Sequence, residues 1–98
     1  MSSKKGRSTE NKATEWIKEQ GYNIINEDTR KGHEGRFGGW PDRLAIDKDD
    51  HLHFFEIKEE THELDPHQEK VLNALKRCGT VHVLVYKDLE MVEDRILK

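Results

Sequence analysis

Three charged side chains in the middle of the chain have the types and spacing that could hold a metal ion: Asp42, Glu56 and Lys58. The runs 43–47 and 52–58 are short and rich in apolar residues, and a polar turn separates them. This pattern predicts a β-hairpin. The hairpin would bring the two carboxylates, which are far apart in the sequence, to the same end of two paired strands.

The turn determines which residues of the predicted hairpin face each other. If Asp47 faces His51, Asp42 lies directly opposite Glu56, and such partners have Cβ atoms about 4.5 to 5.5 Å apart. Because strand side chains alternate, Lys58 shares a face with Glu56. Two carboxylates so close repel each other, so we expect a hard divalent cation between them, since Mg²⁺ is typically held by one or two carboxylates plus waters and phosphates.

A plainer interpretation makes Asp42 an ordinary turn residue, and Glu56 with Lys58 a surface ion pair. The residues beside Glu56 argue against it, because they are apolar on both faces of the strand: Phe54, Phe55 and Ile57. That pattern is typical of an interior strand. Charges inside a sheet usually pair or bind a metal.

Two further polar residues lie on the inward faces of predicted helices. Glu10 shares a helix face with Ala13 and Ile17, and Gln68 lies above Leu72 in the same way. Each also fits a role at a helix end, where Glu10 would complement the helix dipole. Together with the hairpin residues, they predict a polar pocket.

The elements that position these residues are predicted to follow one another as α-β-β-β-α-β-α. We expect residues 1–7 to form a flexible basic arm and 8–98 to form a single domain. The first helix is expected from Ser8 or Thr9 to about Gln20. A strand over 22–25 and a glycine-rich loop over 28–40 then precede the hairpin.

The C-terminal part of the chain predicts a helix, a strand and a closing helix. Asp65 caps the first of these helices and Pro66 opens it, and Gly79 ends it. The run 81–86 is almost continuously apolar, as in the interior strand of a sheet. Residues 88–97 are expected to form the closing helix.

Charge is distributed unevenly along the chain. The net charge of −3 argues against a general nucleic-acid binder, but residues 1–43 carry +2 and the remainder −5. A surface for phosphate groups would therefore lie in the N-terminal part; the alternative is a solubilising tail and a solvated loop. The basic residues that would contact DNA are Lys4, Lys5, Arg7, Lys12, Arg30, Lys31, Arg36 and Arg43.

Composition sets the remaining expectations. Only 33% of the residues are apolar and 38% are charged, so the core is small and a homodimer is an expected source of further stability. The single cysteine, Cys78, and the lack of an apolar leader predict an intracellular, cytoplasmic protein. No run reaches the roughly 18 apolar residues of a membrane span, so no membrane partner is expected.

Three segments carry a resemblance to a known family: Gly39-Trp40-Pro41-Asp42-Arg43-Leu44, then Phe55-Glu56-Ile57-Lys58, then Gln68. Over roughly Ser8 to Lys98, the chain resembles the VRR-NUC (virus-type replication-repair nuclease) family of the PD-(D/E)xK superfamily. The resemblance implies a restriction-endonuclease-like α/β fold, a mixed central β-sheet flanked by helices. It also implies hydrolysis of phosphodiester bonds in DNA with Mg²⁺ or Mn²⁺.

The resemblance also implies roles for individual residues. Asp42, Glu56 and the backbone carbonyl of Ile57 would bind the metal, and Glu10 would reach it through water. Lys58 would orient or activate the attacking water, and Gln68 would support the site. Stand-alone members of the family are typically dimeric bacteriophage or other viral proteins that act on branched DNA such as Holliday junctions, which implies action in a host cytoplasm.

Two rival functions remain open. The first is a non-catalytic module of the same fold that only holds branched DNA. The second is a zinc protein, although the histidines lack tight ligand spacing: His33, His51, His53, His62, His67 and His82. Nucleophilic catalysis and nucleotide hydrolysis find no support, because there is no Gly-x-Ser-x-Gly turn and no phosphate-cradling loop.

Overall fold

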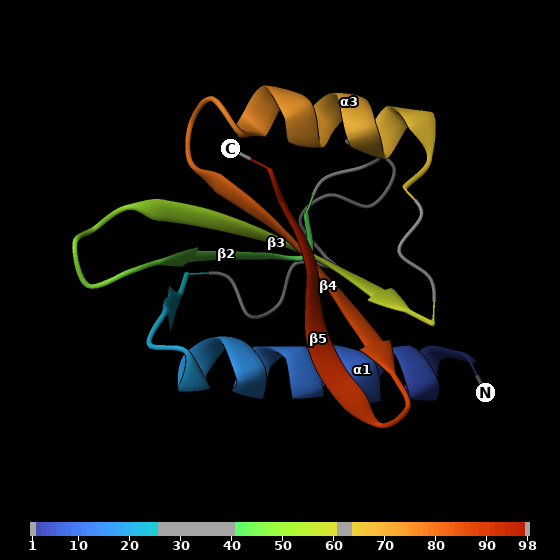
Figure 1. The fold of residues 1–98 in the computed structure, drawn as a ribbon. Helices are drawn as coiled ribbons and strands as arrows, with labels where there is room; N and C mark the ends of the chain where they lie inside the picture. Colours follow the sequence, from blue (N-terminus) through green and yellow to red (C-terminus); the bar gives the residue numbers. More distant parts are fainter. Residues whose placement is uncertain (1, 26–40, 61–63, 98) are drawn as a thin grey trace.

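The computed structural model describes residues 2–25, 41–60 and 64–97, with the backbone alone for 2–8. The elements are α1 (Ser2–Glu19), β1 (Asn23–Ile24), β2 (Arg43–Ile46), β3 (Leu52–Glu59), α3 (Pro66–Leu75), β4 (Thr80–Lys87) and β5 (Glu90–Leu97). The strands form one five-stranded sheet in the order β1-β2-β3-β4-β5. Figure 1 shows α1 on one face of this sheet and α3 on the other, so the protein is a mixed α/β fold in three layers.

The predicted hairpin and its register are confirmed. β2 and β3 pair in antiparallel fashion with Arg43 opposite Phe55 and Ile46 opposite Leu52, which is the register expected from the turn. The turn closes with a backbone hydrogen bond of 3.0 Å from Asp47 to His51. β3 and β4 then pair in parallel, and the remaining neighbours pair in antiparallel fashion.

The helix α3 begins as predicted and connects β3 to the parallel strand β4. Its N-cap Asp65 accepts a hydrogen bond from the backbone of Gln68, and the Gln68 side chain accepts one from the backbone of Asp65, a complete capping box. Gly79, expected as a helix end, is required by a close approach of two backbones. A Cβ atom there would lie 2.3 Å from the carbonyl oxygen of Leu52.

The sheet buries a separate apolar cluster under each helix. Phe55 and Leu84 pack with Ala13 and Ile17 on the α1 face. Alternate residues point to the opposite face, where Phe54 and others pack with Leu72 of α3. Glu56 and Lys58 therefore belong to the α3 face, whereas His53 and Phe55 belong to the α1 face.

One predicted boundary and one predicted element are wrong. The first helix begins at Ser2, so the segment expected to be a flexible arm has helical backbone. Residues 88–97 form no helix; they contain the edge strand β5, which forms a hairpin with β4. Asp88 and Leu89 make the turn with φ of 54° and 65°, the backbone that a tight hairpin requires. Among the described helices, none is long and apolar enough to cross a membrane.

Candidate active site

Glu56, Lys58 and Gln68 form a hydrogen-bonded triad between β3 and the first turn of α3. The Gln68 amide donates to Glu56 Oε2 over 2.9 Å, and Lys58 Nζ donates to Gln68 Oε1 over 2.8 Å. Lys58 Nζ also lies 3.5 Å from Glu56 Oε2. Because the capping box orients Gln68, the start of α3 determines how the carboxylate and the ammonium are held.

Asp42 joins this group from the residue before β2. Its backbone N–H donates to the carbonyl of Phe55 over 3.0 Å, and its carboxylate accepts a 2.9 Å hydrogen bond from the backbone of Ile57. Asp42 is thus bonded to both neighbours of Glu56 in β3. The continued register of the hairpin places Asp42 opposite Glu56, as predicted from the sequence.

Burial and mutual repulsion disfavour two negative charges at this site. Burial, and next the charge of Asp42, raise the pKa of Glu56 to about 8, although Lys58 opposes the shift. Burial also raises the pKa of Asp42, and Glu10 adds to this, while the hydrogen bond from Ile57 opposes it. When both carboxylates are ionised, their two negative charges therefore exceed the single positive charge of Lys58.

The donor set at Glu56 fits an added cation. Glu56 is 4% exposed, and its Oε1 has no hydrogen-bond partner among the residues that the structure describes. A buried carboxylate oxygen without a partner is costly, and a divalent cation would satisfy it. No group of three or more histidine, cysteine or acidic side chains in the described residues is arranged to hold a metal ion. A cation would therefore rest on two carboxylates, with backbone and solvent oxygens completing its ligands.

Glu10 lies beside this pair but is held by Arg43. Glu10 Oε1 is 3.3 Å from Arg43 Nη2. The same guanidinium donates to Thr14 Oγ1 over 3.2 Å and to the carbonyl of Asp42 over 2.9 Å. Arg43, expected to contact DNA, is only 4% exposed, and its burial argues against a phosphate contact. Its contacts instead link α1 to the backbone of Asp42.

We expect Arg43→Met to lower the free energy of unfolding by about 2 kcal/mol, because Glu10 and Thr14 lose their buried charged donor. Urea denaturation against the exposed control Arg77→Met would measure the change. The salt dependence of DNA affinity should be the same for Arg43→Met as for the unaltered protein. A decrease of about one in its log–log slope would instead show that Arg43 contacts a phosphate.

The other predicted DNA contacts are only partly visible. Arg30, Lys31 and Arg36 lie outside the described residues, and Lys4, Lys5 and Arg7 lie in the segment of α1 whose side chains are not described. Lys12 is exposed and lies 5.9 Å from the centroid of the Tyr86 ring. The described structure therefore brings together Asp42, Glu56, Lys58 and Gln68, with Glu10 one contact away.

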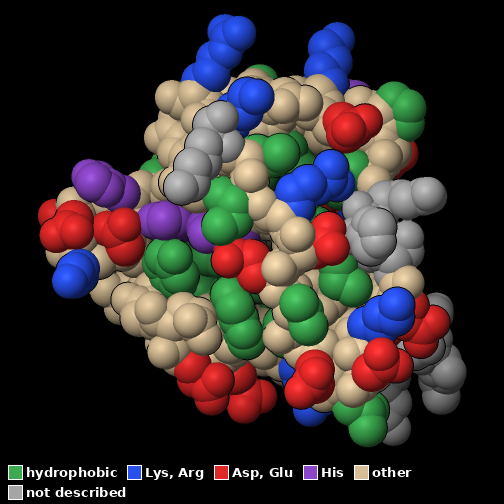
Figure 2. Space-filling model, in the orientation of Figure 1, with side chains coloured by type: hydrophobic (Ala, Val, Ile, Leu, Met, Phe, Trp, Pro, Cys, Tyr) green, Lys and Arg blue, Asp and Glu red, His purple; other side chains and the backbone are tan. Residues whose placement is uncertain are grey.

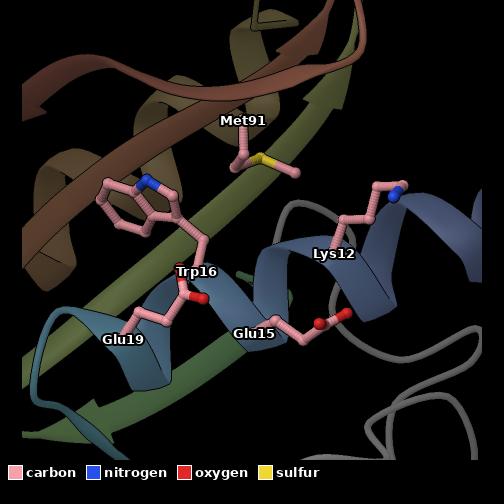
Figure 3. Close-up of a pocket in the computed structure, with 5 residues that line it drawn as sticks. All are labelled: Lys12, Glu15, Trp16, Glu19 and Met91. Atoms are coloured by element: carbon pink, nitrogen blue, oxygen red, sulfur yellow. The ribbon is translucent and has the colours of Figure 1, made fainter.

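Lys12 also borders an open groove between α1 and β5, into which Trp16 from α1 and Met91 from β5 project (Figure 3). Glu15 and Glu19 also line the groove, so its charged groups are the ammonium of Lys12 and two carboxylates. This mixed charge is unlike a surface for a phosphate chain. The groove lies on the α1 face of the sheet, opposite the face to which Glu56 points.

Sequence reasoning did not identify Thr14 and Asp65 as supports of the site. Thr14 holds Arg43, and Asp65 holds the backbone of Gln68. The sequence indicates Asp65 only as a helix cap, and its spacing from Gln68 is the available indication of a capping box. Scans of the sequence against protein-family models and curated proteins find no match.

Proposed function

We propose that this chain is a metal-dependent DNA endonuclease with a restriction-endonuclease-like fold, of the kind that its resemblance to VRR-NUC nucleases implies. One observation carries the proposal: Glu56 is buried opposite Asp42 with an oxygen that no described residue satisfies. Lys58 is held beside it through Gln68. Two carboxylates and an ammonium in this arrangement suit phosphodiester hydrolysis better than structural support.

Each residue has a role in the proposal. Asp42, Glu56 and the backbone carbonyl of Ile57 would hold Mg²⁺ or Mn²⁺, and Glu10 would act on the ion through water. Lys58 orients the attacking water, and Gln68 keeps the ammonium close to Glu56. A bound divalent cation supplies Lewis-acid activation of the phosphoryl group and stabilises the leaving oxygen.

The substrate in this proposal is branched DNA such as a Holliday junction, and the active form is a homodimer acting in the cytoplasm of a bacterial or phage-infected cell. The small, highly charged chain supports dimerisation. A dimer would present two sites to the two strands of a symmetric junction that must be cut. The basic residues near the N-terminus and in 26–40 supply the phosphate contacts.

A labelled four-way junction, a flap, a duplex and a single strand, incubated with Mg²⁺, Mn²⁺ or a chelator, would test the proposal. We expect cleavage only with metal, and fastest for the junction. Cleavage that persists in the chelator, or a pure protein inert on all four substrates, would contradict it.

The second candidate is a non-catalytic module that binds branched DNA. The pairing of Glu10 with Arg43 favours it, because that carboxylate is already neutralised. Tight, metal-independent binding of the junction without cleavage would establish this module instead of the nuclease.

A further inference from the structure

Four titratable side chains outside the candidate active site form one hydrogen-bonded chain across the sheet. His53 Nε2 lies 2.9 Å from Asp47 Oδ2, and His53 Nδ1 lies 2.8 Å from His82 Nε2. His82 Nδ1 is hydrogen-bonded to Glu93 Oε2. The chain thus runs from the β2–β3 turn through β3 and β4 to the edge strand β5.

The two imidazoles lie in an aromatic part of the α1 face. His53 is 8% exposed and His82 is 3% exposed. The Phe55 ring stacks on His82 at 4.4 Å between centroids, and the Tyr22 ring lies 4.6 Å from His53. α1 contributes the apolar Ala13 and Ile17 to the same core. Water is therefore largely kept away from the bond between the two rings.

The charged groups that face this pair are acidic at both ends. Asp47 lies at one end, and its Oδ1 accepts hydrogen bonds from the backbone of Asp49 and His51. The hydrogen bond from His53 lowers the pKa of Asp47 to about 2, and the backbone bonds contribute, so this carboxylate is ionised. Glu93 lies at the other end.

Two other titratable groups lie close to this chain of side chains. The exposed His51 ring lies 3.9 Å from Asp47, and Tyr22 covers His53. Figure 2 shows acidic, lysine and histidine side chains gathered at the tip of the β2–β3 hairpin, on the left. The tip is thus a mixed-charge surface, with the carboxylate of Asp47 directed inward to His53.

The three hydrogen bonds among Asp47, His53, His82 and Glu93 need more protons than two neutral imidazoles carry. A neutral imidazole has one N–H, and His53 and His82 each direct it to a carboxylate. The two remaining nitrogens would then both be acceptors, yet they face each other at hydrogen-bond distance. The three bonds require three protons, one more than two neutral imidazoles supply.

We propose that His53 and His82 form a buried binding site for a single proton, which they share between Asp47 and Glu93. The bound proton makes the central hydrogen bond and leaves the chain of four groups with one net negative charge. Through the hydrogen bond of His82 to Glu93, this proton stabilises the contact of the edge strand β5 with the interior of the sheet. Loss of the proton leaves two imidazole lone pairs in contact, and a second proton has no acceptor between the rings.

The stability of the protein depends on pH because the folded and unfolded states bind different numbers of protons at these two histidines. Below the free imidazole pKa of about 6.5, each of the two histidines in the unfolded protein binds one proton more than the neutral ring carries. The folded pair binds one such proton in total, so acid favours unfolding. Above that pH, the unfolded chain binds none and the folded chain still holds one, so base favours unfolding. The contribution of the pair to stability is therefore greatest near neutral pH and falls on both sides.

Imidazole ¹⁵N spectra of the unaltered protein, recorded at about pH 7.5 where most free imidazoles are neutral, would test the count directly. We expect protons on His53 Nε2 and His82 Nδ1, and a third proton shared by the two facing nitrogens. Two neutral rings at this pH would overturn the proposal, as would stoichiometric zinc retained between them. This measurement requires no variant to fold.

Urea unfolding of the unaltered protein and of His53→Phe/His82→Phe would then measure the linkage. The ratio of the two unfolding constants should change about tenfold per pH unit on each side of about pH 6.5. The same ratio for the exposed control His67→Gln should show no such optimum. A ratio that changes on the acid side alone would mean that the folded pair binds no extra proton, and would overturn the proposal.

Discussion

Replacing Glu56 by glutamine, or Asp42 by asparagine, is expected to lower metal-dependent DNA cleavage by about a thousandfold or more. A bound cation stabilises a phosphoryl-transfer transition state by several kcal/mol, and each 1.4 kcal/mol corresponds to about a factor of ten in rate. Each amide keeps the size of its carboxylate but loses the charge that would hold the ion. Single-turnover cleavage of a labelled junction, with saturating protein and a titration of Mn²⁺, would measure the loss.

The matched control for this experiment is Glu69→Gln. Glu69 lies in the first turn of α3, next to Gln68 in sequence, but is exposed. We expect its cleavage rate to remain within about twofold of the unaltered protein, because surface charges contribute little. Near-normal cleavage by Glu56→Gln would refute the assignment of the active site, provided that circular dichroism shows the same fold.

The same substitution is expected to stabilise the metal-free protein at alkaline pH. The pKa of Glu56 is raised from 4.5 to about 8, so the folded state binds the proton more tightly than the unfolded state does. The resulting stability is fully present below pH 4.5 and is lost as the pH rises through about 8. Glu56→Gln has no such ionisation, and at about pH 8 it should exceed the unaltered protein by a few kcal/mol.

Urea denaturation of both proteins at several pH values, in the presence of a chelator, would measure this pH-dependent difference in stability. Adding Mn²⁺ should narrow this difference at alkaline pH by stabilising the unaltered protein, because an ion bound only by the folded state stabilises it by about 2.7 kcal/mol at a hundred times its dissociation constant. Equal pH slopes for the two proteins would show that Glu56 ionises normally. Identical responses to Mn²⁺ would show that this carboxylate does not bind the ion.

The hairpin and the helix α3 were predictable because local rules determine them. A turn of given length sets the register of an antiparallel pair, and this register brought Asp42 opposite Glu56. The Asp65 cap and Pro66 begin a helix through backbone hydrogen bonds within one turn. Gln68 was found by its helical spacing for the same reason.

The edge strand β5 could not be read from its own residues. Its inward positions include the charged Glu93 and Arg95, whereas Val92 and Ile96 are exposed, so its apolar residues do not report which face is buried. Pairing with β4 determines the strand. Asp88 and Leu89 adopt positive φ values in the β4–β5 turn, and the sequence Asp-Leu does not predict this backbone conformation.

The sequence alone determined the β2–β3 hairpin, the start of α3 and the opposed carboxylates, because turn length, strand alternation and helix caps act over a few neighbouring residues. Only the tertiary structure decided that Arg43 is buried against Glu10 and that His53 meets His82 between two carboxylates. Those contacts join residues from separate elements. Which of these residues meet depends on how the helices and strands pack, and no spacing along the chain encodes that arrangement directly.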